Sequence, residues 1–322
     1  MKIGAAFGKL LTGEQIIREF LTVGIEDYHL VREKVYLRVG DAVLEVSGNQ
    51  WLLSLDPPVI GIWVEDRAAA ALFGPDREYR LYFRDCAPAP GALPGRNALS
   101  VLSVEFADRL DEKDGTLFLL RVSSTTIRHV SAIRARLIFE KFYKKPGLRF
   151  ERLKTIAAAY TYPRRVRIIS FQLEENYNYI FPMDLLADIR SCGRFLFGMR
   201  HSNQVLKRIV DVKKIVVAEA PASCKGTIYK LGRNHSASPP SLEEYPFGLI
   251  RTREFGYYLP EWVEGYKEVI IDRTADLGSH MLLSGQWSEE VVLKPAAPHL
   301  HHIHFLHFLY LKGRGTTYPV IQ

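Results

Sequence analysis

The chain has 322 residues, which is long enough for two domains. Its hydrophobic fraction of 47% and charged fraction of 25% are those of a folded protein and exclude a disordered chain. The formal net charge of +7 favours an anionic partner such as a phosphate or nucleotide, but Lys and Arg are spread along the chain, so we expect no nucleic-acid partner.

Cysteine usage and the N-terminal residues bear on the compartment. Cys86, Cys192 and Cys224 stand far apart without a C-x-x-C pair, which argues against a zinc site or a disulfide framework. The N-terminus carries Lys2 and Lys9 and lacks an apolar core of signal-peptide length. No window approaches the roughly 20 apolar residues that span a bilayer. We therefore expect a cytoplasmic protein with no membrane partner.

Short β-like runs dominate the first half of the chain. After a helix expected over residues 13–20, the pattern predicts strands over 34–39, 43–46, 51–55, 59–64, 79–83, 99–106 and 116–122. Apolar residues at helical spacing then predict a helix over 126–143, which Pro146-Gly147 ends. We place the domain boundary there, with an N-terminal α+β domain of unassigned fold over residues 1–147 and a C-terminal domain over 148–322.

The second half opens with a helix or extended arm over 148–159. Strands are predicted over 166–173, 194–199, 214–218, 268–272, 280–287 and 303–311, with helical turns over 203–209 and 223–231. Many short strands with few long helices favour a barrel over a doubly wound sheet. The fold class is therefore mainly β with some α. No G-x-G-x-x-G or Walker loop supports a Rossmann or P-loop nucleotide site.

An aromatic, Asn-rich turn is expected over residues 176–184, where the sequence is Asn-Tyr-Asn-Tyr-Ile-Phe-Pro-Met-Asp. A flavin ring needs a flat apolar surface beside polar groups for its pyrimidine edge. Phe181-Pro182-Met183 provides such a wall, and Asp184 with the backbone amides provides the polar edge. A hairpin loop whose aromatics merely cover the end of a barrel would show the same pattern.

A basic, hydroxyl-bearing turn follows the strand over 194–199. It consists of Arg200-His201-Ser202-Asn203 and leads into a helical segment. A cation, a hydroxyl and the free N–H groups of a helix N-terminus together hold a phosphate. An ordinary capped helix with exposed basic residues is the alternative.

Two isolated histidines are candidates for ligand contacts. His280 follows Gly278 at the start of a strand, where it can reach a ligand at the mouth of a barrel. His235 follows a helical turn and could hold a dinucleotide phosphate or line the same pocket. A histidine that bonds a backbone carbonyl is the commoner structural alternative.

The third histidine feature is a run over residues 299–307 that holds five of the ten histidines. On a strand, His302 and His304 would share one face, and imidazoles at i and i+2 can ligate a transition metal. No Asp, Glu or Cys lies within the run to complete a catalytic zinc site, and we assign no metal ligand. No G-x-S-x-G or H-E-x-x-H motif supports hydrolysis.

Taken in order, these pieces resemble the flavin reductase-like family of FMN-binding split barrels. The resemblance runs from about residue 148 to near the C-terminus. It rests on the strand over 166–173, the Tyr-Asn-Tyr-Ile-Phe-Pro-Met-Asp segment, the Arg-His-Ser-Asn turn, Ile-Tyr-Lys-Leu-Gly-Arg-Asn-His over 228–235 and Leu-Gly-Ser-His over 277–280. It implies a six-stranded antiparallel Greek-key split barrel that forms a homodimer and binds FMN near the subunit interface. It also implies hydride transfer from NADH or NADPH to the flavin, with a monooxygenase as a possible recipient of the reduced flavin.

The resemblance also assigns residues. His280 is the expected catalytic residue, and the expected cofactor contacts are Asn178, Phe181, Pro182, Met183, Asp184, Leu185, Arg200, His201, Ser202, Asn203 and His235. Many relatives carry small hydroxyl residues where Pro182 to Leu185 stand, and the S-x-D-P-P run that follows in the family is missing from the second half. The sequence shows no convincing internal repeat. The segment over 51–59, which contains Ser-Leu-Asp-Pro-Pro, nevertheless echoes a strand-turn-strand of the same family and raises the idea of a degenerate second copy.

Three functional hypotheses follow. The first is an FMN-dependent NAD(P)H oxidoreductase. The second is a non-catalytic flavin-binding protein whose N-terminal half binds a partner. The third is a metal-dependent enzyme built on the histidine run over 299–307.

Overall fold

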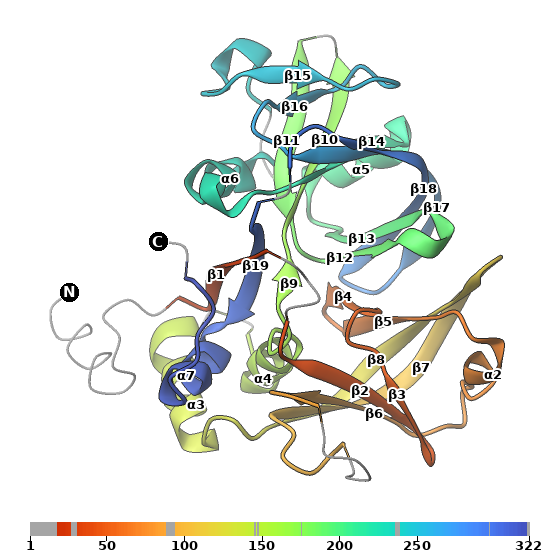
Figure 1. Cartoon of the computed structure of the whole chain (residues 1–322), viewed down its shortest axis with the longest axis vertical. Coiled ribbons are helices and arrows are strands. Elements are labelled where there is room, and N and C mark those ends of the chain that lie inside the picture. Colours follow the sequence, from red (N-terminus) through yellow and green to blue (C-terminus); the bar gives the residue numbers. More distant parts are fainter. Residues whose placement is uncertain are drawn as a thin grey trace, which may run out of the picture.

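The computed structural model describes residues 18–26, 31–87, 94–144, 146, 148–174, 176–235, 239–295 and 297–320. Within these residues the chain forms two seven-stranded antiparallel sheets, one from each half of the chain, and two smaller sheets. Figure 1 shows the sheet of the N-terminal half below that of the C-terminal half, with a group of helices beside the lower sheet. The predicted fold class, mainly β with some α, is confirmed.

The sheet of the N-terminal half is called the first barrel. Its strands are β2 (Lys34–Val39), β3 (Ala42–Glu45), β4 (Gln50–Leu55), β5 (Pro58–Val64), β6 (Tyr79–Arg84), β7 (Ser100–Glu112) and β8 (Gly115–Ile127). The order across the sheet is β3-β2-β6-β7-β8-β5-β4. Residues 46–49 alone join the two edge strands, β3 and β4, so the sheet must curl until its edges approach each other. Its inner face is apolar, with Leu37, Ile60, Ile62 and Leu81 fully buried.

The sheet of the C-terminal half is called the second barrel. Its strands are β10 (Arg167–Glu174), β11 (Tyr177–Met183), β12 (Leu186–Ile189), β13 (Arg194–Arg200), β14 (Lys214–Glu219), β17 (Gly265–Asp276) and β18 (His280–Val292), in the order β11-β10-β14-β17-β18-β13-β12. Asp184 and Leu185 alone join its edge strands, β11 and β12, so this sheet also curls into a barrel. The segment expected as an aromatic turn is therefore strand β11. Its β-favouring residues pair with β10, and only Asn176 and Asp184 lie outside the strand, one at each end.

The two barrels have the same topology. Numbered by their place in the chain, the strands of each sheet follow the order second, first, fifth, sixth, seventh, fourth, third. A helix follows the fourth strand in both, α2 (Arg67–Ala70) in the first barrel and α5 (Gln204–Val212) in the second. The N-terminal half thus has the fold of the C-terminal half, and the idea of a second copy in the first half gains a structural basis.

An apolar cluster joins the two barrels. Five buried side chains come from each barrel, namely Leu53, Val59, Trp63, Leu117 and Leu119 from the first and Ala187, Ile189, Leu196, Leu277 and Leu282 from the second. Glu112 of the first barrel also lies 3.0 Å from the guanidinium groups of both Arg194 and Arg273 of the second. The barrels therefore pack as one unit.

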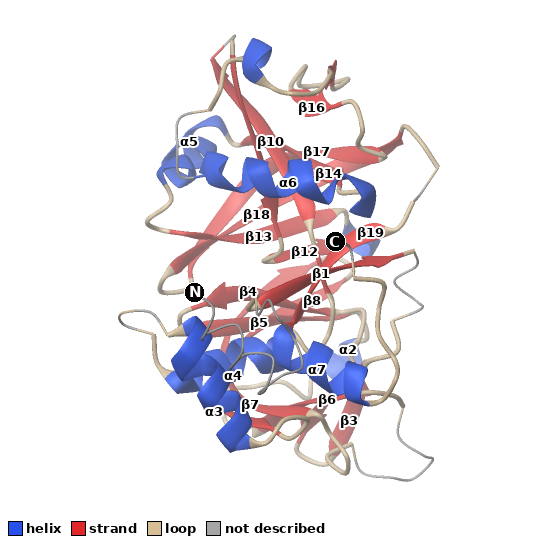
Figure 2. Cartoon of the chain, turned by 90° about the vertical axis from the view of Figure 1, so that its left-hand side faces the viewer, coloured by secondary structure: helices blue, strands red, loops and turns tan. Residues whose placement is uncertain are grey.

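A third layer lies beside the barrels. Strand β19 (His299–His304) pairs with β1 (Phe20–Ile25) and β9 (Arg164–Arg165). Next to it, α3 (Ala132–Ile138), the π-helix η2 (Phe139–Tyr143), α4 (Phe150–Ala159) and α7 (Phe305–Gly313) share one apolar cluster. Figure 2 shows α3, α4 and α7 together at the level of the first barrel. Helix α4 bonds that barrel directly, since Thr155 Oγ1 lies 2.8 Å from Thr125 Oγ1.

Three predicted elements differ from the structure. The strand expected over 303–311 ends at His304, and the chain continues as α7, which His304 caps by accepting from Leu306 N. The prediction is wrong there because a continuous apolar run does not distinguish strand from helix. The helix expected over 126–143 begins only at Ala132, because the preceding β-branched residues extend β8 to Ile127. Of the helix expected over 13–20, residues 13–17 lie outside the described residues, and Phe20 begins β1.

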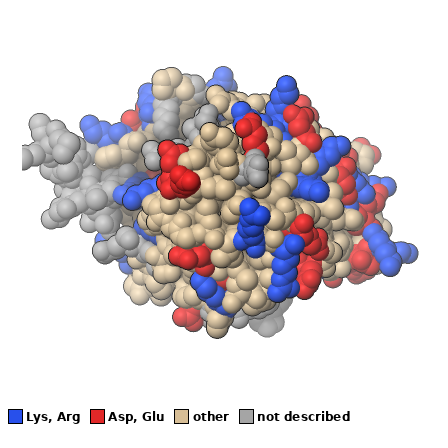
Figure 3. Space-filling view, turned by 90° about the horizontal axis from the view of Figure 1, so that it is seen from above, with Lys and Arg blue, Asp and Glu red and all other residues tan. Residues whose placement is uncertain are grey.

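The remaining elements lie in the second barrel. The turn after β12 forms η3 (Arg190–Cys192), and the connection from β14 to β17 holds η4 (Ala222–Cys224), α6 (Lys225–Leu231), η5 (Gly232–His235), η6 (Leu242–Glu244), β15 (Leu249–Arg251) and β16 (Tyr258–Pro260). Figure 3, which views the molecule from above, shows Lys and Arg interspersed with Asp and Glu over that face. No helix among the described residues is long and apolar enough to cross a membrane. The domain boundary between residues 147 and 148 stays a prediction.

Candidate functional site

A cavity of about 410 Å³ opens in the second barrel where three separate segments meet. Its walls are the end of β11 with the turn to β12, the end of β13 with the turn to α5, and the first residue of β18. The lining contains nine of the twelve residues predicted from the sequence, together with Gly198: Phe181, Pro182, Met183, Asp184, Leu185, Arg200, Ser202, Asn203 and His280. Strand pairing brings these segments together, because Arg200 lies opposite His280 and Gly198 N donates to Leu185 O.

The apolar wall of the cavity comes from the end of β11. The Phe181 side chain is fully buried and belongs to the core of the second barrel, while Pro182 and Met183 are half-buried. Pro182 and Met183 therefore offer the surface that a planar ligand would meet, and Phe181 supports it from behind.

The opposite end of the cavity suits an anion. Arg200 is exposed there, with Ser202 and Asn203 beside it. Asn203 is the N-cap residue of the nine-residue helix α5, but no side chain among the described residues bonds the first N–H groups of this helix as a cap. Leu206 N donates to Asn203 O, but the N–H groups before it have no side-chain cap, and they lie at the helix N-terminus with a cation and a hydroxyl.

His280 is buried at the inner side of the cavity. Its Nδ1 lies 2.7 Å from Ser279 Oγ and 3.2 Å from Ser54 Oγ of the first barrel. Burial, and then the positive charge of Arg200, lower the pKa of His280 to about 4. The imidazole is therefore neutral at neutral pH and acts as a hydrogen-bonding group, so the positive charge of the lining comes from Arg200.

Asp184 is tied into a chain of hydrogen bonds. Its Oδ2 accepts from Tyr160 OH at 2.8 Å and lies 2.7 Å from His302 Nδ1. His302 Nε2 in turn bonds Tyr229 OH, which lies 2.5 Å from Thr22 Oγ1. Burial alone would raise the pKa of Asp184, but the hydrogen bonds with His302 and Tyr160 lower it. Asp184 is therefore an anion at neutral pH whose orientation is fixed by its neighbours.

Three predicted contacts do not line this cavity. Asn178 is fully buried, and its amide donates to Ser170 Oγ and Tyr258 O. Its side chain therefore holds β16 against the sheet and is not a contact residue of the cavity. His201 lies in the adjoining hollow that Ser202 and Asn203 share, with Nε2 3.1 Å from Asp276 Oδ1. The side chain of His235 lies outside the described residues.

Sequence reasoning missed the contacts that the first barrel makes with residues of the cavity lining and with the loop before His280. The β4–β5 turn lies against the loop before His280, where Ser279 N donates to Asp56 O at 2.8 Å. A Cβ atom on Gly198 would lie 1.7 Å from Leu53 O, so glycine is required there for the two barrels to approach. The Ser-Leu-Asp-Pro-Pro echo over 54–58 indicates a second copy of the fold but does not predict this contact.

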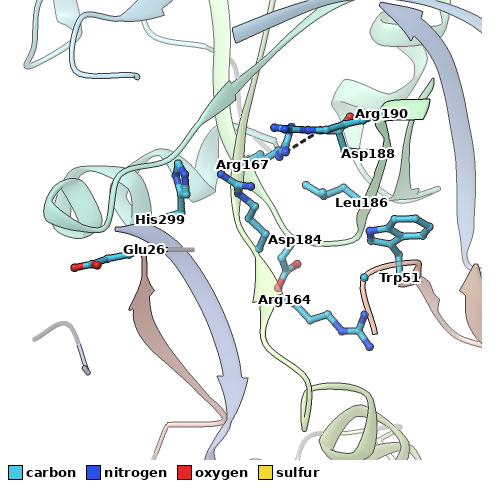
Figure 4. A pocket seen from close by; sticks show the side chains of 11 residues that line it. Glu26, Trp51, Arg164, Arg167, Asp184, Leu186, Asp188, Arg190 and His299 are labelled. Atoms are coloured by element: carbon cyan, nitrogen blue, oxygen red, sulfur yellow. Dashed lines mark ion pairs between the residues drawn. The ribbon is translucent and has the colours of Figure 1, made fainter. Parts of the chain in front are cut away.

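A second cavity, of about 350 Å³, lies between the barrels (Figure 4). Figure 4 shows His299 and Glu26 on one side of it, Trp51 and Leu186 on the other, and Arg164, Arg167 and Asp184 between them, and the remaining lining residues are Gly48, Arg165, Asp188 and Arg190. The two cavities share Asp184 and are therefore neighbours.

The charges of this second cavity are mostly paired. Arg167 bonds Asp188 at 2.9 Å and Glu219 at 3.1 Å, and both carboxylates are nearly buried. Burial would raise the pKa of Asp188, but Arg167 and Lys267 outweigh it and lower the pKa. Arg190 differs, because 62% of its side chain is exposed and its nearest carboxylate oxygen is 3.4 Å away on Glu290. Arg190 is thus the cation of this cavity that an incoming anion can reach.

The histidine run does not converge on one point. His302 bonds Asp184, His304 caps α7, and His307 Nε2 lies 2.8 Å from Glu33 Oε1. Among the described residues, no three His, Cys, Asp or Glu side chains are placed to hold a metal ion.

Comparisons with known proteins give likenesses to solved structures only; no protein-family model and no curated protein matches the chain. The similar structures include an FMN-binding protein from Thermus thermophilus with bound p-hydroxybenzaldehyde, with 14% identity over 44% of this chain and 80% of that one, at a TM-score of 0.38. The styrene monooxygenase flavin reductase from Pseudomonas putida S12 has 14% identity, coverages of 45% and 89%, and a TM-score of 0.38. The NADH:FAD oxidoreductase of Streptomyces globisporus has 13% identity, coverages of 48% and 93%, and a TM-score of 0.42. Each of these likenesses covers less than half of this chain.

Proposed function

We propose that this protein binds FMN in the cavity of the second barrel and transfers hydride from NADH or NADPH to the bound flavin. One observation carries the proposal. Three separate segments line a single cavity of about 410 Å³: one expected to contact a flavin ring, one expected to hold its phosphate, and His280, expected near the flavin or the nicotinamide. That volume lies in the range of small-molecule sites.

The cavity offers a suitable surface to each part of FMN. The ring would lie against Pro182 and Met183, and the phosphate would be held by Arg200, Ser202 and the open N–H groups of α5. His280 and Asp184 also line the cavity, where they can bond the polar atoms of the ligand.

The reaction would need orientation and electrostatics from the protein but no strong acid or base. Bound FMN would supply the redox chemistry. The positive charge of Arg200 would stabilise negative charge that develops on the flavin, and the neutral His280 would contribute a hydrogen bond without adding charge. The hydrogen bonds of Asp184 with His302 and Tyr160 would hold its carboxylate in a fixed orientation.

The second cavity is the proposed route for the nicotinamide donor. Hydride transfer needs the reacting atoms within about 3.5 Å of each other, so the donor must bind beside the flavin. The cavity between the barrels shares Asp184 with the flavin cavity, and the exposed Arg190 can meet a dinucleotide diphosphate there. Reduced flavin could then pass to a partner monooxygenase.

A visible absorption spectrum tests the proposal directly. The purified protein is mixed with FMN, dialysed, and then treated anaerobically with NADH or NADPH. Retained flavin bands that bleach with one donor support the oxidoreductase, and the faster donor identifies the preference. Retained bands that do not bleach would favour a non-catalytic flavin-binding protein, and a failure to retain flavin would refute the site.

Single substitutions then locate the site. Ser202→Ala and Asp184→Ala should each weaken FMN binding, by roughly threefold to thirtyfold for the loss of one hydrogen-bonding group. Ser223→Ala, an exposed serine next to α6 and away from the cavity, is the matched control. Unchanged flavin titrations for both site variants would mean that the cofactor binds elsewhere.

A further inference from the structure

The two barrels of this chain are built alike, but the corresponding turns after their fourth strands are chemically opposite. In the second barrel, β13 leads through Arg200 and Ser202 into α5. No described side chain caps the N-terminus of this helix. In the first barrel, β5 leads through Glu65 and Asp66 into α2, which is only four residues long. A cation and a hydroxyl in one barrel are thus matched by two carboxylates in the other.

The acidic turn of the first barrel is also occupied by its own side chains. Asp66 Oδ1 accepts from Ala68 N at 2.8 Å, so its carboxylate takes the place that an anion would need at this helix. Glu65 Oε1 accepts from Trp63 Nε1 at 3.1 Å and adds a second negative charge. A phosphate would be repelled here.

The first barrel instead contributes to the cavity of the second. Ser54 Oγ, which is fully buried, lies 3.2 Å from His280 Nδ1, and the Leu53 carbonyl packs on the backbone of Gly198. The Asp56 carbonyl accepts from Ser279 N, next to His280. The β4–β5 hairpin therefore contacts His280 and Gly198, two residues that line the flavin cavity.

From these contrasts we infer that the first barrel is a built-in partner subunit that has lost its own anion site and completes the flavin site of the second barrel. This inference rests on the proposed function of the second barrel. One chain then holds one flavin, the pairing of barrels occurs within the chain, and the homodimer expected from the sequence is not needed for binding. Ser54 is the positioning residue from the first barrel, because its Oγ lies 3.2 Å from His280 Nδ1, which Ser279 Oγ also approaches to 2.7 Å.

The test counts flavins per chain. FMN is titrated into the full chain at a protein concentration well above the dissociation constant, while light scattering after gel filtration gives the particle mass. We expect one FMN per particle of 36.8 kDa. Two FMN per chain would show that the first barrel also binds flavin and would overturn the inference. So would a particle of twice that mass that loses its flavin when dilution dissociates it.

Ser54 provides the second measurement. Ser54→Ala should weaken FMN binding about threefold to tenfold and change the visible circular dichroism of the bound flavin. Ser54→Thr keeps the hydroxyl and should leave the FMN affinity and the circular dichroism close to wild type. Ser100→Ala, a buried serine of the same barrel that bonds Thr161, is the matched control and should leave both readings unchanged. A wild-type titration without FMN binding would end the proposed function and this inference together. One FMN per chain with a Ser54→Ala variant indistinguishable from wild type would end the inference alone.

Discussion

The two barrels share a strand order, but the described turns after their fourth strands carry opposite charges. The fourth strand of the second barrel ends in Arg200. Its helix α5 has nine residues, and no described side chain caps the N-terminus of this helix. The first barrel has Glu65 and Asp66 at the corresponding turn, and its helix α2 has four residues. The difference lies in a few residues between one strand and one helix.

This comparison separates what the fold requires from what the site requires. The curled sheet depends on alternating apolar residues such as Ile60 and Ile62 in one barrel and Phe195 and Phe197 in the other, and both barrels keep them. An anion site depends on the charge and the N–H groups of one turn, which can change without disturbing the core. The scaffold therefore persists in the first barrel where the site chemistry does not.

The largest expected effect is a loss of folding stability at acidic pH. Measuring it also tests whether the two barrels unfold as one unit. Burial, as the first cause in each case, lowers the pKa of five histidines, to about 4 for His280 and His299 and to about 3 for His129, His301 and His304. Between these values and about 6.5 the unfolded chain binds more protons than the folded chain, so stability falls as the pH falls. Each histidine should contribute about 1 kcal/mol of this loss at pH 5.5.

Urea unfolding at pH 7.5 and pH 5.5 measures this effect. We expect the midpoint to be clearly lower at pH 5.5, in a single transition, because three of these histidines lie on β19, the strand that pairs with both β1 and β9. His301→Asn should reduce the pH dependence. Two separate transitions would show that the barrels fold independently, and equal midpoints at the two pH values would contradict the burial of the neutral histidines.

The next effect concerns the contact between the barrels. Gly198→Val places a side chain where even a Cβ atom would lie 1.7 Å from Leu53 O, so the barrels must separate. We expect a loss of about 3 kcal/mol, the upper end of the cost of overpacking, together with loss of FMN binding. Thermal unfolding measures the first and a flavin titration the second.

The matched control for Gly198→Val is Gly226→Ala. Gly226 lies in α6, is exposed, and a Cβ atom there would meet nothing within 4 Å, so this variant should be as stable as wild type or slightly more stable. A Gly198→Val variant with wild-type stability would mean that the close approach of the barrels is not needed for folding.

These differences also explain how much of the fold can be predicted from the sequence. Strands such as those over 34–39 and 194–199 were predicted within a residue or two, because their side-chain pattern and turn signals are local. The terminal run over 303–311 was wrong beyond His304, because an apolar run lacks the periodicity that separates helix from strand. The sequence assigns no fold to the first barrel, because the family resemblance depends on the residues of the site and Glu65 and Asp66 stand at the corresponding turn.

Much of the candidate site was likewise local in sequence. Segments 181–185 and 200–203 and His280 were predicted separately, and the structure brings nine of the twelve predicted residues around one cavity. Ser54 was missed because its contact with His280 spans 226 residues, and no local pattern encodes that distance. Asn178 was chosen for its position in an expected turn, and its place inside a strand commits its amide to Ser170 and Tyr258.

A charge reversal makes the second barrel resemble the first at one position. Arg200→Glu should weaken FMN binding about tenfold to hundredfold, because it removes a charged hydrogen bond to the phosphate and adds repulsion. Riboflavin, which lacks the phosphate, should bind the variant and the wild type alike. Fluorescence titrations with both ligands measure this difference.

Arg67→Glu is the matched control for Arg200→Glu, since it makes the same charge change on the exposed first residue of α2. It should leave FMN affinity unchanged. If both variants weaken FMN binding equally, the effect is one of net charge and not of a phosphate contact.

The smallest effect concerns the cavity between the barrels, which neither barrel forms alone. Arg190→Glu reverses the exposed cation of that cavity and should raise KM for NADH or NADPH about threefold to tenfold, as expected for one partly screened ionic contact. The kcat value and the FMN affinity should stay close to wild type, because Arg190 does not line the flavin cavity. The effect on KM should shrink as salt is added. A change in FMN affinity without a change in KM would assign Arg190 to the flavin, and the donor would then have to approach the ring by another route.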